Sequence, residues 1–266
     1  YTVDIDQFMS DVAAEGYTNL DWSRFYISFN QYDDQGPTCS YNDGIGIDEV
    51  TVTVTEARTW NGSAGNSNWN NAGNWSGGNV PGSSAAVTIA DVTNDPVLNA
   101  NDQVGSITIQ SGGVLTLNSS VTLTSSSVEL QSGGDLVISN GELNCTGKFD
   151  HDGDLTMSGS GVLDIDGEYE SSASATEIIT GGTIEVAGEW DGALDNAFTP
   201  TGGTVEFNGG ADQAFAQHSS ANFYNLTINN GSYDADAGSN FAVTGALTLT
   251  AGELDISTHT ATVTGA

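Results

Sequence analysis

A short sequence motif recurs along most of the chain and limits the folds available to it. The motif is one or two glycines followed by alternating apolar and small polar residues. Gly112 to Gly133 and Gly181 to Gly202 are both steps of 21 residues. The alternation is typical of a β-strand with one buried face. A fixed period of this size without helical spacing indicates stacked β coils, in which each turn buries its inner face only against its neighbours. The repeat therefore predicts a β-solenoid.

The apolar members of these strands form the predicted inner face. Stacked in register they would make continuous ladders, and each backbone would pair with the turns above and below it. The predicted inward residues are Val114, Leu115, Leu117, Val121, Leu123, Leu136, Ile138, Leu155, Met157, Leu163, Ile165, Ile184, Val186, Val205, Phe207, Leu226, Ile228, Leu247, Leu249, Leu254 and Ile256. A coil without an evident cap, as near Ala266, is a site for adding a further chain. We expect a homo-polymer or continuation of a longer chain.

The charge balance narrows the list of partners. The chain has 3 Lys plus Arg against 35 Asp plus Glu, a formal net charge of −32. Such a surface repels nucleic acid and anionic membranes, so no nucleic-acid partner is expected. No apolar run is long enough to span a bilayer, which predicts no membrane insertion. The composition favours an extracellular or cell-surface location.

Composition divides the chain into three predicted parts: 1–57, 58–90 and 91–266. The first part holds nine of the 22 aromatic residues, which indicates a separate core. Within it, Ile5, Phe8, Met9 and Val12 follow the spacing of one helix face, and two alternating strands come after them. One helix and two strands cannot close a sandwich alone. The pattern resembles the end of a jelly-roll domain of the carbohydrate-binding or glucanase-like type, which implies a partial β-sandwich with one short helix.

The second part, 58–90, is rich in Trp and Asn. Trp60, Trp69 and Trp75 fall within sixteen residues. Large flat side chains and Asn-rich turns suit a cap over the open end of a solenoid, which otherwise exposes apolar groups and unpaired backbone. The alternative is a glycan-binding platform, formed by these three indoles and Trp22, on which sugar rings stack.

Two phrases carry a second resemblance. They are Trp60-Asn61-Gly62 with the later Asn-Trp pairs, and the stretch from Gly203-Thr204-Val205-Glu206-Phe207 to Phe223-Tyr224-Asn225-Leu226. They resemble repeats of long bacterial secreted or cell-surface proteins of the adhesin-like or autotransporter-like kind, over about residues 59–266. The resemblance implies a right-handed parallel β-helix for 91–266, with turns of about 20–21 residues, and an extracellular scaffold or adhesive role. It carries over no catalytic residue.

Two acidic clusters have a residue spacing similar to that of calcium-binding loops. One comprises Asp150, Asp152 and Asp154, and the other Asp234, Asp236 and Asn240. Alternating oxygen side chains near a glycine suit Ca²⁺, although neither cluster has the later bidentate Glu of an EF-hand. Solvated turns are the alternative interpretation. A zinc site is less expected, because His151, His218 and His259 have no Cys or His at ligand spacing.

The functional hypotheses follow from this pattern. Lyases of acidic sugars need cations near the substrate, and Arg24, Arg58 and Lys148 are the only permanent ones. No nucleophile elbow or phosphate-binding loop is evident, so no enzymatic activity and no cofactor other than calcium are expected. We predict a structural subunit of an extracellular fibre or surface adhesive structure. A carbohydrate-binding adhesin module is the alternative, and a glycan-active enzyme is third.

Overall fold

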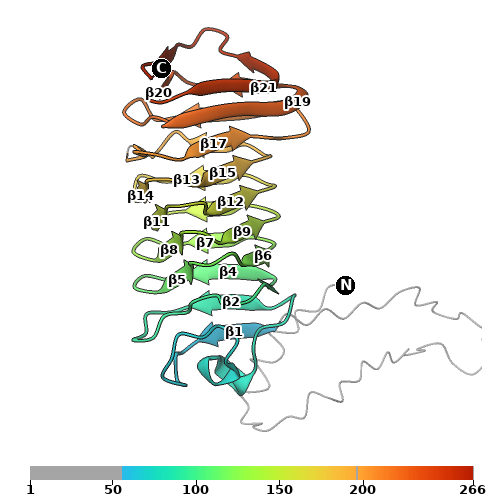
Figure 1. Ribbon diagram of the computed structural model, residues 1–266, viewed down its shortest axis with the longest axis vertical. Helices are drawn as coiled ribbons and strands as arrows, with labels where there is room; N and C mark the ends of the chain where they lie inside the picture. The colour runs from blue at the N-terminus through green and yellow to red at the C-terminus, as the bar shows by residue number, and fades with distance from the viewer. Residues whose placement is uncertain (1–55, 196, 266) are drawn as a thin grey trace, which may run out of the picture. The chain divides into compact units, whose positions relative to one another are not determined.

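The computed structural model describes residues 56–195 and 197–265, and this part of the chain is a parallel β-solenoid of about eight turns (Figure 1). The mainly β fold predicted from the repeat is confirmed. The described part has almost no helix, only the two 3-10 turns η2 (Ala72–Asn74) and η3 (Ser76–Gly78), and no helix there could cross a membrane. The predicted helix and partial sandwich of 1–57 lie outside the described residues but for the last two positions, as do Trp22 and Cys39.

The strands form three parallel stacks. The first stack contains β1 (Ala57–Trp60), β2 (Ala86–Ile89), β4 (Ser106–Ile109), β7 (Val128–Leu130), β10 (Phe149–His151), β13 (Tyr169–Ser171), β16 (Trp190–Gly192) and β18 (Gln213–Gln217). The second contains β3 (Asp102–Gln103), β6 (Thr122–Ser125), β9 (Glu142–Cys145), β12 (Val162–Ile165), β15 (Thr183–Val186) and β17 (Thr204–Phe207). The third contains β5 (Val114–Leu117), β8 (Asp135–Ile138), β11 (Asp154–Met157) and β14 (Thr176–Ile179).

The C-terminal strands close over two of these stacks. The long strand β19 (Asn225–Ala237) pairs with both β17 and β18 and so joins the first and second stacks into one 16-stranded sheet. Above it lies β21 (Leu247–Asp255), while β20 (Phe241–Val243) pairs with β22 (Ala261–Val263). The third stack ends at β14, so the turns beyond it have a different cross-section.

In-register ladders of alternate residues make the core. Leu143, Leu163, Ile184, Val205 and Leu226 occupy one column of the second stack and are all buried. Most predicted inward residues lie in such columns, as the alternation requires. Val114 is only half-buried, because Leu115 and Leu117 take the inner face of β5. In the last turn, Leu249 and Ile256 are exposed.

The first stack was not anticipated as a distinct set of strands. Its inner column reads Val128, Phe149, Tyr169 and Trp190, in register. The rings of Phe149 and Tyr169 stack with centroids 5.9 Å apart, and those of Tyr169 and Trp190 stack at 4.0 Å. Offset-stacked aromatic pairs with centroids about 4.5–7 Å apart, the range that includes Phe149 and Tyr169, stabilise beyond their buried area. The column therefore forms an aromatic ladder inside the solenoid.

A free thiol lies in the second stack. Cys145 is buried, and its Sγ lies 3.2 Å from the Lys148 carbonyl oxygen. Burial raises the pKa of this thiol to about 11. A buried, protonated thiol is inert, so Cys145 serves as a small core side chain.

Glycines line the corner between the second and first stacks. At Gly167, a Cβ atom would lie 2.5 Å from the carbonyl carbon and 2.6 Å from the carbonyl oxygen of Gly147, directly below. The same close approach of backbones recurs at Gly188, above Gly167. Only glycine lets successive turns approach this closely.

Three indoles cover the first described turn, which lies at the β1 end in Figure 1. Trp75 makes edge-to-face contacts with Trp60 and Trp69, at centroid distances of 5.0 and 4.7 Å. Each indole N–H has an acceptor: Trp75 donates to the Trp69 carbonyl at 2.7 Å, Trp60 to the Asn94 carbonyl and Trp69 to Asp102. The three rings are fully or almost fully buried. We refer to Trp60, Trp69 and Trp75 as the indole cluster.

Outward positions of the strands form columns of carboxylates. On the second stack, Asp164, Glu185 and Glu206 are in register on successive strands. Partial burial raises the pKa of Asp164 and of Glu185, and neighbouring carboxylates add to both shifts: Asp166 and Glu142 for Asp164, and Asp164, Glu206 and Glu142 for Glu185. Like charges stacked in this way repel.

The Glu185→Gln substitution is expected to stabilise the protein at pH 7 in low salt, by roughly 0.5 kcal/mol after solvent screening. A raised folded-state pKa means that this carboxyl contributes full stability below its unfolded value, and loses that contribution as pH rises through the folded pKa. The variant's advantage in melting temperature should therefore be largest at pH 7 and disappear near pH 4. High salt should reduce it at pH 7. A variant less stable than the parent at pH 7 in low salt would contradict this account.

Candidate functional site

A cluster of ionisable side chains lies inside the solenoid, whose core is otherwise mostly apolar. On the third stack, Leu115, Leu136 and Leu155 form an inner column, and the next residue in register is Glu177. The side chain of Glu177 has no exposed area, although the residue as a whole is only partly buried. A carboxyl group thus occupies a position that the repeat fills with leucine.

The inner face of the first stack carries a histidine, and the next residue in the same column is small. His151 follows Ile109 and Leu130 in an inner column of the first stack, and Ser171 comes next above it. Asp195 enters from the loop after β16, where the Oδ1 atom accepts hydrogen bonds from the backbone N–H groups of Ala197 and Phe198. Small Ser171 leaves room for Glu177 and Asp195 beside the imidazole.

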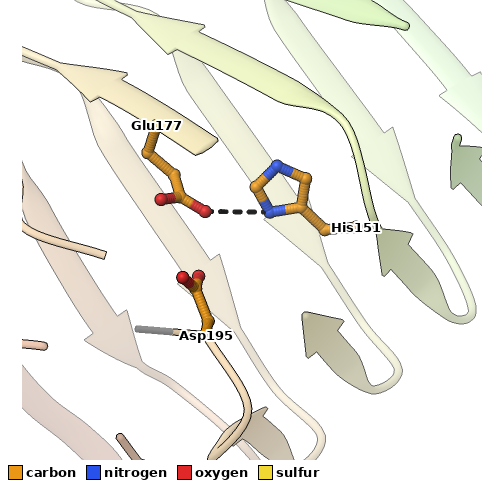
Figure 2. Close-up of side chains that lie close together, drawn as sticks. All are labelled: His151, Glu177 and Asp195. Atoms are coloured by element: carbon orange, nitrogen blue, oxygen red, sulfur yellow. Dashed lines mark ion pairs between the residues drawn. The ribbon is translucent and has the colours of Figure 1, made fainter. Parts of the chain in front are cut away.

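The three side chains point toward one another (Figure 2). The Nδ1 atom of His151 lies 3.3 Å from Oε1 of Glu177 and 2.9 Å from the Tyr169 hydroxyl. One ligand atom each from His151, Glu177 and Asp195 falls within 4.8 Å of the others. Within the described residues, this is the one group of three or more His, Cys, Asp or Glu side chains so placed.

The environment favours the neutral forms of Glu177 and His151. Burial, followed by the charge of Asp195, raises the pKa of Glu177 to about 9, and burial lowers the pKa of His151 to about 4. The pKa of Tyr169 is raised well above its ordinary value, first by burial and then by Glu177 and Asp195. With no ion bound, Glu177 is therefore a neutral acid and His151 a neutral base at pH 7. The closed cluster can hold a proton or a cation, and its side chains offer no surface to a substrate.

The expected calcium residues take other positions. Asp150 belongs to strand β10 and Asp154 to strand β11, so this segment is a pair of strands around a corner rather than a metal loop. Lys148 contacts Asp150 at 3.7 Å, and Thr176 donates a hydrogen bond to Asp154. Asp152 lies at the corner between them. The alternation that places His151 inside directs its neighbours outward.

The second expected calcium cluster is also mostly strand. Asp234 and Asp236 lie in β19, where alternation puts Ala235 and Ala237 in the core. Asn240 follows the strand and accepts a hydrogen bond from the backbone N–H of Thr260. Neither set of residues forms the loop from which the calcium prediction was argued.

The indole cluster does not present a platform to solvent. Trp60 and Trp69 have no exposed area and Trp75 has 2%. Sugar stacking requires an exposed ring face, so the glycan-binding role expected for these three residues is not supported in this conformation.

The C-terminal turn is the open end of the described solenoid. Among described strands, β21 pairs only with β19, and β22 only with β20. Leu249 continues the column of Phe207 and Ile228, which are fully buried, yet it is 55% exposed. Val263 is likewise 44% exposed, although Val243 below it is buried. Apolar columns and unpaired strand edges therefore end together at this turn, which we call the open turn.

Over the described residues, the fold and the cluster together define a parallel β-solenoid with a group of three ionisable residues in its core. A family model described as a domain of unknown function (DUF8693) matches residues 59–180, from β1 to the end of the third stack. No curated protein and no solved structure matches the chain. The matched region includes His151 and Glu177 but not Asp195.

From the sequence, His151 has no ligand partner, because no Cys or His lies at ligand spacing near it along the chain. Glu177 and Asp195 are 26 and 44 residues away, on later turns. One signal was present: aligned by its glycines, the segment Thr176–Ile179 places Glu177 where other turns have leucine. A charged residue at an inward repeat position would have identified the site.

Proposed function

We propose that this chain is a structural subunit of an extracellular fibre or surface adhesive structure, joined to its neighbour through the open turn. The observation that carries the proposal is that two apolar columns end exposed, one at Leu249 and one at Val263, beside unpaired strand edges. Edges of this kind accept a further β-strand. The neighbour that we propose and test is a second copy of this chain, and continuation of a longer chain over the same turn is the alternative.

Charge directs the association to the end of the solenoid. Columns of carboxylates such as Asp164, Glu185 and Glu206 cover the side of the second stack, and the net charge of −32 opposes lateral contact. The outer edge of β1 is partly occupied, because Trp60 forms an antiparallel bridge with Trp75 and the Thr59 N–H donates to Ser76 Oγ. A fibre needs two contact surfaces on each subunit. We propose the expected N-terminal sandwich portion as the second, and it lies almost wholly outside the described residues.

Association of the purified chain should increase with protein concentration in sedimentation velocity experiments. The Leu249→Asp substitution is expected to weaken it at least about tenfold, because the charge would be buried without a partner at the new interface. Ile178→Asp is the matched control: it adds the same charge at a 65% exposed position on β14 and should leave association unchanged. A parent chain that stays monomeric throughout the micromolar range, or equal effects of both substitutions, would refute the proposal.

A further inference from the structure

The carboxyl groups of the buried cluster lack a neutralising partner among the described side chains. Apart from the His151 ring and the neighbouring carboxyl group, no side chain in the described part is a hydrogen-bond partner of Oε1 or Oε2 of Glu177, or of Oδ2 of Asp195. The Glu177 side chain has no exposed area and Asp195 is 1% exposed. Unpaired carboxylates away from water are strongly unfavourable unless a proton or a cation neutralises them.

We propose that His151, Glu177 and Asp195 bind a divalent transition-metal ion, with Zn²⁺ as the preferred occupant. Metal binding releases the proton of Glu177, and the two carboxylates with a neutral imidazole then carry two negative charges, which one divalent cation cancels. The donor set of one nitrogen and carboxylate oxygens suits Zn²⁺. Ca²⁺ requires six to eight oxygen ligands and does not use imidazole, so this site differs in chemistry from the calcium loops expected in the sequence.

The distances fit a compact site. Ligand atoms at about 2.0 Å from a tetrahedral zinc ion lie about 3.3 Å from one another. The separation of His151 Nδ1 and Glu177 Oε1 is 3.3 Å. The remaining separations among the three ligand atoms are at most 4.8 Å, so a small side-chain rotation closes the set around an ion. The Tyr169 hydroxyl, 2.9 Å from Nδ1, provides a further oxygen at the same place.

The location gives the ion a structural role. His151 comes from β10, Glu177 from β14 and Asp195 from the loop after β16, so the ion would join three turns where the third stack ends. The side chains are enclosed, and the ion would therefore enter while the chain folds. Metal bound in this way contributes to folding stability.

Refolding of the full chain tests the site with zinc alone as the probe. The protein is unfolded in denaturant with a chelator, then refolded with or without ZnCl₂ and passed over a chelating column to remove surface-bound ions. We expect about one zinc per chain by elemental analysis, and a higher melting temperature for the zinc-refolded protein. Refolding with Co²⁺ should give the visible absorption bands of a tetrahedral nitrogen and oxygen site.

Matched amide variants separate this site from the acidic surface. Glu177→Gln, which preserves shape, should lower retained zinc at least about tenfold and abolish the zinc-dependent shift in melting temperature. Glu185→Gln removes one carboxylate from an outer column and should retain the parent's zinc. If Glu177→Gln does not fold, Asp195→Asn provides the same comparison. Absence of zinc from the refolded parent, or equal zinc in both Gln variants, would overturn the proposal.

Discussion

The Trp75→Ala substitution is expected to lower the free energy of unfolding by about 3–5 kcal/mol. The change removes a buried indole that packs edge-to-face against both Trp60 and Trp69, and it leaves the Trp69 carbonyl without its donor. The turn under the indole cluster would lose its cover, so nearby core residues would gain access to water. Urea unfolding followed by far-UV circular dichroism measures the loss.

Two control variants identify the source of this effect. Trp75→Phe keeps an aromatic ring but cannot donate to the Trp69 carbonyl, so it should be less damaging than alanine. Tyr233→Ala removes a ring that is 45% exposed, and it should change stability by no more than about 0.5 kcal/mol. If Trp75→Ala destabilises no more than Tyr233→Ala, the indole cluster is not part of the core.

The Gly167→Ala substitution is expected to cost about 3 kcal/mol, because the added methyl group overlaps backbone. Its Cβ would lie 2.5 Å from the Gly147 carbonyl carbon and 2.9 Å from the Gly147 Cα. No side-chain rotation relieves this contact, so two turns must separate and weaken the hydrogen bonds between them. Thermal unfolding and amide hydrogen exchange at the neighbouring strands measure the change.

Gly210→Ala is the matched control for the corner. A Cβ at Gly210 would meet no atom within 4 Å, and the residue is exposed. The same chemical change should therefore be neutral, within about 0.5 kcal/mol, or slightly stabilising through the unfolded chain. Equal effects at Gly167 and Gly210 would show that the corner tolerates a side chain.

Local patterns were sufficient to predict the solenoid. Alternation at Leu136 and Ile138, or at Leu163 and Ile165, assigns one face of a strand to the core without knowledge of its partners. The glycine phrases mark the turns, and their spacing indicates repetition. These features are properties of a few consecutive residues, so they can be read from the chain.

The first stack was harder to predict because its strands are short and contain polar inward residues. The strands Phe149–His151 and Tyr169–Ser171 have three residues each, too few for alternation to stand out. From the sequence, the segment containing His151 is therefore interpreted as an acidic turn, with calcium binding and a solvated turn as the alternatives. In the structure, the same alternation places His151 inside and Asp150 outside.

The sequence by itself determined the class of fold, most inward columns of the second and third stacks and the acidic exterior, because each depends on residue type and local period. Only the tertiary structure decided that His151, Glu177 and Asp195 meet, and that Leu249 ends its column exposed. On the third stack, steps between turns vary from 19 residues between Leu136 and Leu155 to 22 between Leu155 and Glu177. Since such differences are absorbed at the corners, the register that joins distant side chains emerges only when the turns are stacked.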